Sequence, residues 1–97
     1  MNLAVTYHAR RRWTERFPGR NLDEELAKAK RPSKKRINDL LRNVPQRYGE
    51  MVRAGGGFLI SAERNPPAVF VIAKDQCAVD RDVVVTAYPL IKRPRRY

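Results

Sequence analysis

The chain has 97 residues, which is enough for one hydrophobic core and too short for two independent domains. Lys and Arg number 21 against 10 Asp and Glu, so the formal net charge is +11. Because such an excess of positive charge repels itself in a compact protein, we expect an anionic partner. Nucleic acid, and RNA in particular, is the leading class, with an acidic protein surface or a phospholipid headgroup as alternatives.

Cysteine content and hydropathy indicate the kind of cellular compartment in which we expect the protein. A single cysteine, Cys77, excludes an internal disulfide, and no second cysteine is present for a zinc site. No apolar run reaches the roughly 20 residues that span a bilayer, and residues 1–6 do not resemble a signal peptide. We therefore expect a cytoplasmic protein with no membrane partner, no metal and no cofactor.

The first segment of the chain predicts a short strand or an extended lead-in over residues 2–7, followed by a helix. In this helix Ala9, Trp13 and Phe17 recur every fourth residue, so they form one apolar stripe. The Pro-Gly pair that follows ends the helix. Thr6 is in position to cap it.

Two further helices are expected in the first half of the chain. Asn21, with Glu24 three residues later, has the form of a capping box and predicts a second helix to about Ala29. Ser33 is a natural cap for a third helix, which runs to about Asn43. The helical region is therefore predicted in two or three pieces.

The second half of the chain predicts short strands, because runs of β-branched and aromatic residues are separated by turn-forming residues. Three antiparallel strands in a meander are expected at residues 58–60, 68–72 and 83–88. An additional short strand around Met51 and Val52 is expected to end in a hairpin turn at Gly55–Gly57.

These elements predict an α+β fold with two or three N-terminal helices packed on a three- to four-stranded antiparallel sheet. We expect one basic domain over residues 1–91 and a flexible basic tail at residues 92–97. The strands at residues 68–72 and 83–85 are apolar on both faces. Helices on one face and a partner or a loop on the other would explain this pattern, and a homodimer is one such arrangement.

A second stripe on the first helix contains His8, Arg12 and Arg16, which also lie four residues apart. A histidine can exchange a proton near neutral pH and arginines can hold a phosphate, so this row suits phosphoryl-transfer chemistry on RNA. The alternative is a basic amphipathic helix that exposes its arginines to water. Because His8 is the only histidine, a two-histidine acid/base pair is excluded.

Other basic residues are candidates for binding a phosphate backbone. Arg10 and Arg11 lie on the first helix, and a second cluster straddles the break between the second and third helices. Its members are Lys28, Lys30, Arg31, Lys34, Lys35 and Arg36. Positive charge at the start of a helix offers a phosphate both side-chain cations and free backbone N–H groups, whereas the alternative is a solvated loop.

The last strand contributes two hydroxyl groups. Alternation along the strand predicts that Thr86 and Tyr88 share one face with Val84, while Val85 and Ala87 share the other. Where that face meets the first helix, these hydroxyls would hold a phosphate or a ribose. Threonine and tyrosine are also good strand formers and need no functional reason to be there.

The helix motif HAxxRxxxR that begins at His8, and the strand motif VVTAYP that begins at Val84, resemble small proteins of the RelE-like ribonuclease-toxin superfamily. Such domains occur in toxin modules and phage genomes. The resemblance implies helices on an antiparallel sheet and metal-independent RNA cleavage with the 2′-hydroxyl as nucleophile. It implies His8 as general acid or base, Arg12 and Arg16 as phosphate ligands, and Thr86 as a substrate-positioning hydroxyl.

One departure from that superfamily concerns the strands. RelE-like toxins usually place several basic and aromatic catalytic residues on them, whereas residues 58–60 and 68–72 are almost wholly apolar here. This departure favours a non-enzymatic relative on the same scaffold. Three classes of function therefore stay open: a toxin-type endoribonuclease, a non-catalytic nucleic-acid binder, and a phage-type inhibitor or adaptor that docks on an acidic protein.

Overall fold

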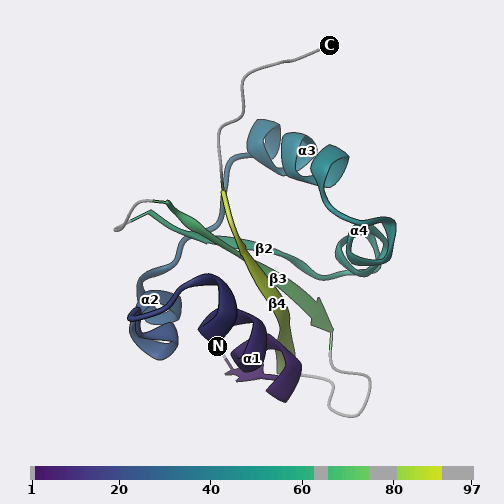
Figure 1. The fold of residues 1–97 in the computed structure, drawn as a ribbon. Helices are drawn as coiled ribbons and strands as arrows, with labels where there is room; N and C mark the ends of the chain where they lie inside the picture. Colours follow the sequence, from purple (N-terminus) through teal and green to yellow (C-terminus); the bar gives the residue numbers. More distant parts are fainter. Residues whose placement is uncertain (1, 63–65, 75–80, 91–97) are drawn as a thin grey trace.

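The structure is a computed structural model that describes residues 2–62, 66–74 and 81–90. Its described elements confirm the predicted α+β class (Figure 1). In chain order they are β1 (Asn2–Val5), α1 (Tyr7–Arg16), α2 (Leu22–Lys28), α3 (Lys34–Asn43), α4 (Gln46–Arg53), β2 (Gly57–Ser61), β3 (Ala68–Lys74) and β4 (Arg81–Pro89).

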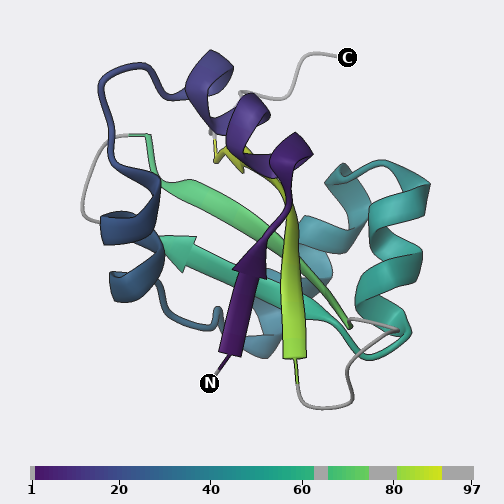
Figure 2. The ribbon, with the colours of Figure 1, turned by 90° about the horizontal axis from the view of Figure 1, so that it is seen from below.

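The strands form one sheet in the order β1-β4-β3-β2. The predicted meander of β2, β3 and β4 is confirmed, since neighbours in this part of the sheet are antiparallel. The prediction of a wholly antiparallel sheet is wrong, because β1 runs parallel to β4 (Figure 2). Alternation in the sequence shows that residues near the start are extended, but it does not show which strand they pair with.

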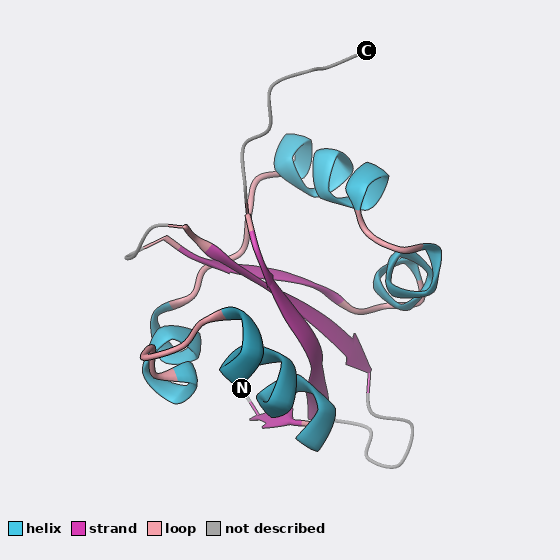
Figure 3. Ribbon diagram, in the orientation of Figure 1, coloured by secondary structure: helices cyan, strands magenta, loops and turns pink. Residues whose placement is uncertain are grey.

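Helices cover both faces of the sheet, with α1 and α2 on one face and α3 and α4 on the other (Figures 1 and 3). Under α1, Trp13 stacks on Phe17 and on Phe70, with ring centroids 4.3 and 5.6 Å apart. These rings belong to the hydrophobic cluster under α1. A second hydrophobic cluster, on the opposite face of the sheet, joins Leu40 of α3 to Phe58 of β2 and to β3. The expectation of helices on one face only is therefore wrong, and the chain itself covers both apolar faces of β3.

The helix α4 replaces the strand that was expected around Met51 and Val52, and this prediction is wrong. Tyr48 and Val52 lie one helical turn apart and pack against the cluster of Leu40 and Phe58. The predicted hairpin turn is instead a helix-to-strand junction, in which Gly55 adopts φ +116° and a Cβ at Gly56 would lie 2.0 Å from the Ile72 carbonyl oxygen.

The three expected helix caps are present. The side chains of Thr6, Asn21 and Ser33 each accept a hydrogen bond from the backbone N–H three residues later, at 3.0, 2.9 and 3.3 Å. Each cap satisfies an N–H group that the helix itself leaves without a partner. The boundaries of α1, α2 and α3 thus follow from local sequence.

Some predictions fall on other parts of the chain. Cys77 and the basic tail at residues 92–97 lie outside the described residues. Within the described ranges, no helix combines the length and the apolar character that crossing a membrane requires.

Candidate nucleic-acid interface

The helix α1 carries the predicted row of one histidine and two arginines, and both arginines are engaged. His8 is exposed near the start of the helix. One turn later, Arg12 donates a hydrogen bond from Nη1 to Glu15 at 3.0 Å. Arg16 donates from Nη1 to the Ala87 carbonyl oxygen of β4 at 2.7 Å. Arg16 therefore fastens α1 to the sheet.

The remaining arginines of α1 also have acidic neighbours. Arg10 pairs with Asp23 of α2 at 3.1 Å, and Arg11 pairs with Glu15 at 3.7 Å. These contacts are exposed, so each contributes little to stability, but they offset part of the positive charge of α1. An anion that binds here has to compete with carboxylates that are already in place.

The sheet separates Thr86 and Tyr88 from α1. Thr86 lies opposite Val71 and Tyr88 opposite Val69, and both valines belong to the cluster on the α3 and α4 side. Thr86 is buried, with 1% of its surface exposed. The structure therefore does not bring Thr86 together with the exposed His8, although the two hydroxyl residues do share a face as predicted.

A β-bulge explains why simple alternation misplaced part of β4. Ile72 pairs with Val84 and Val71 pairs with Thr86, so Val85 is an extra residue in the ladder. The extra residue leaves Val84 and Ala87 in the cluster under α1, and Val85 packs with the other cluster. The prediction that Val84 shares a face with Thr86 is wrong for this reason.

The two hydroxyl groups of β4 are buried, and neither forms a hydrogen bond with another described residue. Neither Thr86 Oγ1 nor Tyr88 Oη has a donor or acceptor within reach in the part of the chain that the structure describes. Burial raises the pKa of Tyr88 to about 12, because the charged phenolate is poorly solvated there. In this conformation the hydroxyls lie beneath α3 and α4 rather than on the surface.

The basic cluster between α2 and α3 differs from α1, because five of its six cations form no ion pair with a carboxylate among the described residues. Lys30, Arg31, Lys34, Lys35 and Arg36 are exposed. In residues 2–62, 66–74 and 81–90, no carboxylate pairs with any of these five side chains. We refer to residues 30–36 as the basic segment. Lys28, the sixth predicted member, lies on α2 and contacts Glu24 at 3.8 Å.

Backbone contacts fix the basic segment against the sheet. The N–H and the carbonyl of Lys30 both pair with Ile60 of β2, at 2.9 and 2.8 Å. At its other end, Ser33 caps α3. The segment thus joins the edge of the sheet to a helix start, where side-chain cations and the positive end of the helix dipole add together.

A buried ion pair was not predicted. Arg20 donates from Nε to Glu25 at 2.7 Å, and the two side chains are only 10% and 7% exposed. Arg20 also donates to the Pro66 carbonyl at 2.8 Å and lies over the Phe17 ring. Ser61 donates to the same carboxylate at 3.1 Å. Glu25 is one of three acidic residues in the first turn of α2, and no local pattern in the sequence identifies its partner.

Comparison with known proteins adds no relative. No protein-family model matches the chain, and no curated protein or solved structure matches it either. The RelE-like resemblance stays a prediction that depends on the two sequence motifs.

Proposed function

We propose that this protein binds RNA and that the basic segment, residues 30–36, is the principal contact with the phosphate backbone. The observation that carries the proposal is the contrast between the two groups of cations. Those of the basic segment have no carboxylate partner in the described chain, whereas the arginines of α1 are paired or bonded.

Unpaired surface cations bind phosphate at low desolvation cost, because no existing ion pair has to be broken. Five such cations within seven residues concentrate positive charge in one part of the chain, which favours contact with several phosphates of one strand. The start of α3 adds backbone N–H groups. The net charge of +11 supports the same class of partner by long-range attraction.

The test is a titration of labelled single-stranded RNA at several salt concentrations, with the triple variant Lys34→Gln, Lys35→Gln, Arg36→Gln. We expect the variant to bind about tenfold to a hundredfold more weakly at low salt. The slope of log affinity against log salt should fall in magnitude by about 2, since each lost phosphate contact contributes roughly 0.7 on a single strand.

A charge-matched control separates local contact from overall charge. The variant Arg42→Gln, Arg47→Gln, Arg53→Gln removes the same number of cations from α3 and α4, beyond the basic segment. We expect this control to weaken binding less than about threefold, through long-range attraction alone. Equal effects of the two variants would show that the basic segment has no special role.

RNA cleavage is the second candidate function, and the exposure of His8 favours it, because an exposed imidazole can reach a bound strand. Incubation of the protein with single-stranded RNA in EDTA tests it. Cleavage that is lost in His8→Ala, with binding retained, would support a metal-independent endoribonuclease. Binding without cleavage would leave a non-catalytic binder, and neither signal would point to an acidic protein partner.

A further inference from the structure

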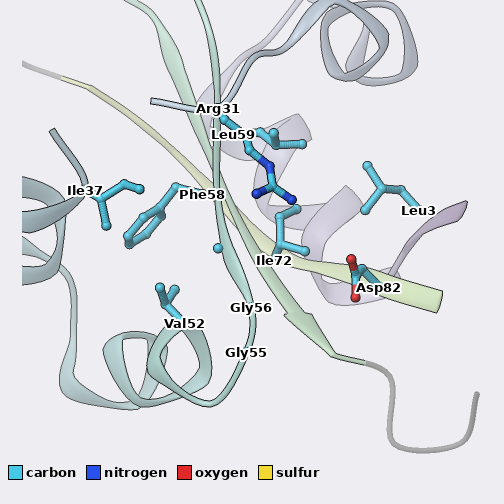
Figure 4. A pocket seen from close by; sticks show the side chains of 11 residues that line it. Leu3, Arg31, Ile37, Val52, Gly55, Gly56, Phe58, Leu59, Ile72 and Asp82 are labelled. Atoms are coloured by element: carbon cyan, nitrogen blue, oxygen red, sulfur yellow. The ribbon is translucent and has the colours of Figure 1, made fainter. Parts of the chain in front are cut away.

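A cavity opens beside the basic segment, at the start of β2 next to Gly55, Gly56 and Gly57. Its volume is about 240 Å³. Figure 4 shows the Arg31 side chain reaching along β2 beside Leu59. The other side chains that line the cavity are Leu3, Ile37, Val52, Phe58, Ile72 and Asp82. Most of its lining side chains are thus apolar, and one cation and one carboxylate are among them.

Arg31 belongs both to the basic segment and to this cavity. Its neighbour Lys30 is held to β2 by two backbone hydrogen bonds, so the Arg31 backbone is fixed beside the edge of the sheet. The Arg31 guanidinium has no carboxylate partner among the described residues. A phosphate bound by the basic segment would therefore bring its own nucleotide to the mouth of the cavity.

Gly57 makes room for a flat group in the cavity. Gly57 pairs with Ile72, and a Cβ built on Gly57 would have no atom within 4 Å, so the space above it is open. Leu59 and Ile72 flank this space with apolar surface. Pockets for drug-sized ligands occupy roughly 300 to 1,000 Å³, so a cavity slightly below that range suits a single ring system.

We propose that this cavity holds one unpaired nucleobase, and hence that the RNA ligand is single-stranded. The inference rests on the proposed function and names the class of RNA. The base would lie against Leu59 and Ile72 over Gly57, with Arg31 on its phosphate or stacked on the ring. A base inside a duplex is stacked and paired and cannot enter, whereas an unpaired base can.

Asp82 gives the cavity a preference among bases. A carboxylate only accepts hydrogen bonds, and adenine, cytosine and guanine each carry an exocyclic amino group with two donor hydrogens, whereas uracil has no amino group and offers a single donor, its ring N3–H. We therefore expect bases with an amino group to bind better than uracil. The variant Asp82→Asn, whose amide both donates and accepts, should remove this preference and leave overall affinity similar.

The experiment compares wild type and Gly57→Val by fluorescence anisotropy, with a single-stranded RNA and a duplex of equal length. Valine suits a strand, and its Cβ would meet no atom within 4 Å, so its side chain would extend into the open space. We expect wild type to prefer the single strand and Gly57→Val to lose about tenfold in affinity for it, with duplex affinity unchanged. Ala27→Leu, at an exposed position of α2, is the bulk-adding control.

The outcomes separate the cavity from the basic segment. The cavity holds no base if Gly57→Val binds the single strand as tightly as wild type, or if wild type binds the duplex as tightly as the single strand. In either case, weaker RNA binding by the variant with Lys34, Lys35 and Arg36 replaced would still support the proposed function. If wild type binds no RNA, the proposed function is wrong. An NMR titration with adenosine and uridine monophosphates then tests base binding in the cavity. Shifts of the Gly57 and Leu59 amide signals would support base binding there, and unchanged signals would overturn it.

Discussion

Buried polar side chains in this protein have contrasting surroundings. The carboxylate of Glu25 accepts hydrogen bonds from Arg20 and from Ser61. In the described chain the hydroxyls of Thr86 and Tyr88 have no partner. An unsatisfied buried hydroxyl costs roughly 1 to 3 kcal/mol of stability. These two hydroxyl groups therefore lower the stability of the folded protein.

The Tyr88 hydroxyl should make stability depend on alkaline pH. Burial raises its pKa to about 12, above the ordinary value of 10.0, so the unfolded chain releases this proton first. Stability should therefore be unaffected by Tyr88 below pH 10 and fall as the pH rises from 10 to 12. In Tyr88→Phe we expect about 1 kcal/mol more stability at pH 7 and a shallower alkaline decline.

Urea denaturation of wild type and Tyr88→Phe from pH 8 to pH 12 measures both effects. Tyr7→Phe serves as the control, because Tyr7 is 81% exposed and its loss should change neither the midpoint nor the slope. Parallel declines in wild type and Tyr88→Phe would show that the burial of this hydroxyl does not control the alkaline transition.

At the scale of elements, the ion pair of Arg20 and Glu25 connects three parts of the fold. Arg20 lies in the connection between α1 and α2, Glu25 lies on α2, and Ser61 ends β2. The variant Glu25→Ala leaves a buried guanidinium without its carboxylate, so we expect a loss of about 3 to 5 kcal/mol. Replacing both partners, as in Arg20→Met with Glu25→Leu, should restore much of that stability.

Chemical denaturation of these variants gives the free energies directly. Glu24→Ala is the matched control, because Glu24 is an exposed acid next in sequence and should cost less than about 1 kcal/mol. A loss in Glu25→Ala no larger than that in Glu24→Ala would mean that the ion pair does not hold these elements together.

Elements whose signal is local could be predicted from the sequence. The caps at Thr6, Asn21 and Ser33 and the stripe of α1 depend on residues within one or two turns. The parallel pairing of β1 with β4 depends on contacts such as the hydrogen bond from the Thr6 N–H to the Val84 carbonyl, 78 residues away. The helix α4 was missed because its apolar face is completed by α3 and the sheet.

In the candidate site, too, the local features could be predicted from the sequence and the non-local ones could not. The charge of the basic segment is visible in the sequence, and so is the spacing that lets Arg11 and Arg12 reach Glu15. The bond of Arg16 to the Ala87 carbonyl is non-local and was not predicted. Alternation put Thr86 on the right face relative to Tyr88, but only the packing of α3 and α4 shows that this face is covered.

For the whole molecule, salt should affect stability and RNA binding in opposite directions. With a net charge of +11, screening of self-repulsion favours the folded state, whereas the same screening weakens attraction to phosphates. Between about 50 and 500 mM potassium chloride, where the Debye length falls to a few ångströms, we expect the melting temperature to rise and RNA affinity to fall. A melting temperature that falls with salt would show that specific ion pairs outweigh self-repulsion.

The parallel pairing of β1 with β4 also determines when the sheet can form during synthesis of the chain. Among the described strands β1 is made first and β4 last, and β4 provides the pairing for β1 and the main packing surface for α1. A nascent chain therefore cannot complete this sheet until β4 has left the ribosome, because contacts between distant parts of the chain form late. The basic segment emerges well before that, so on the ribosome its cations are displayed on a chain whose sheet is still incomplete.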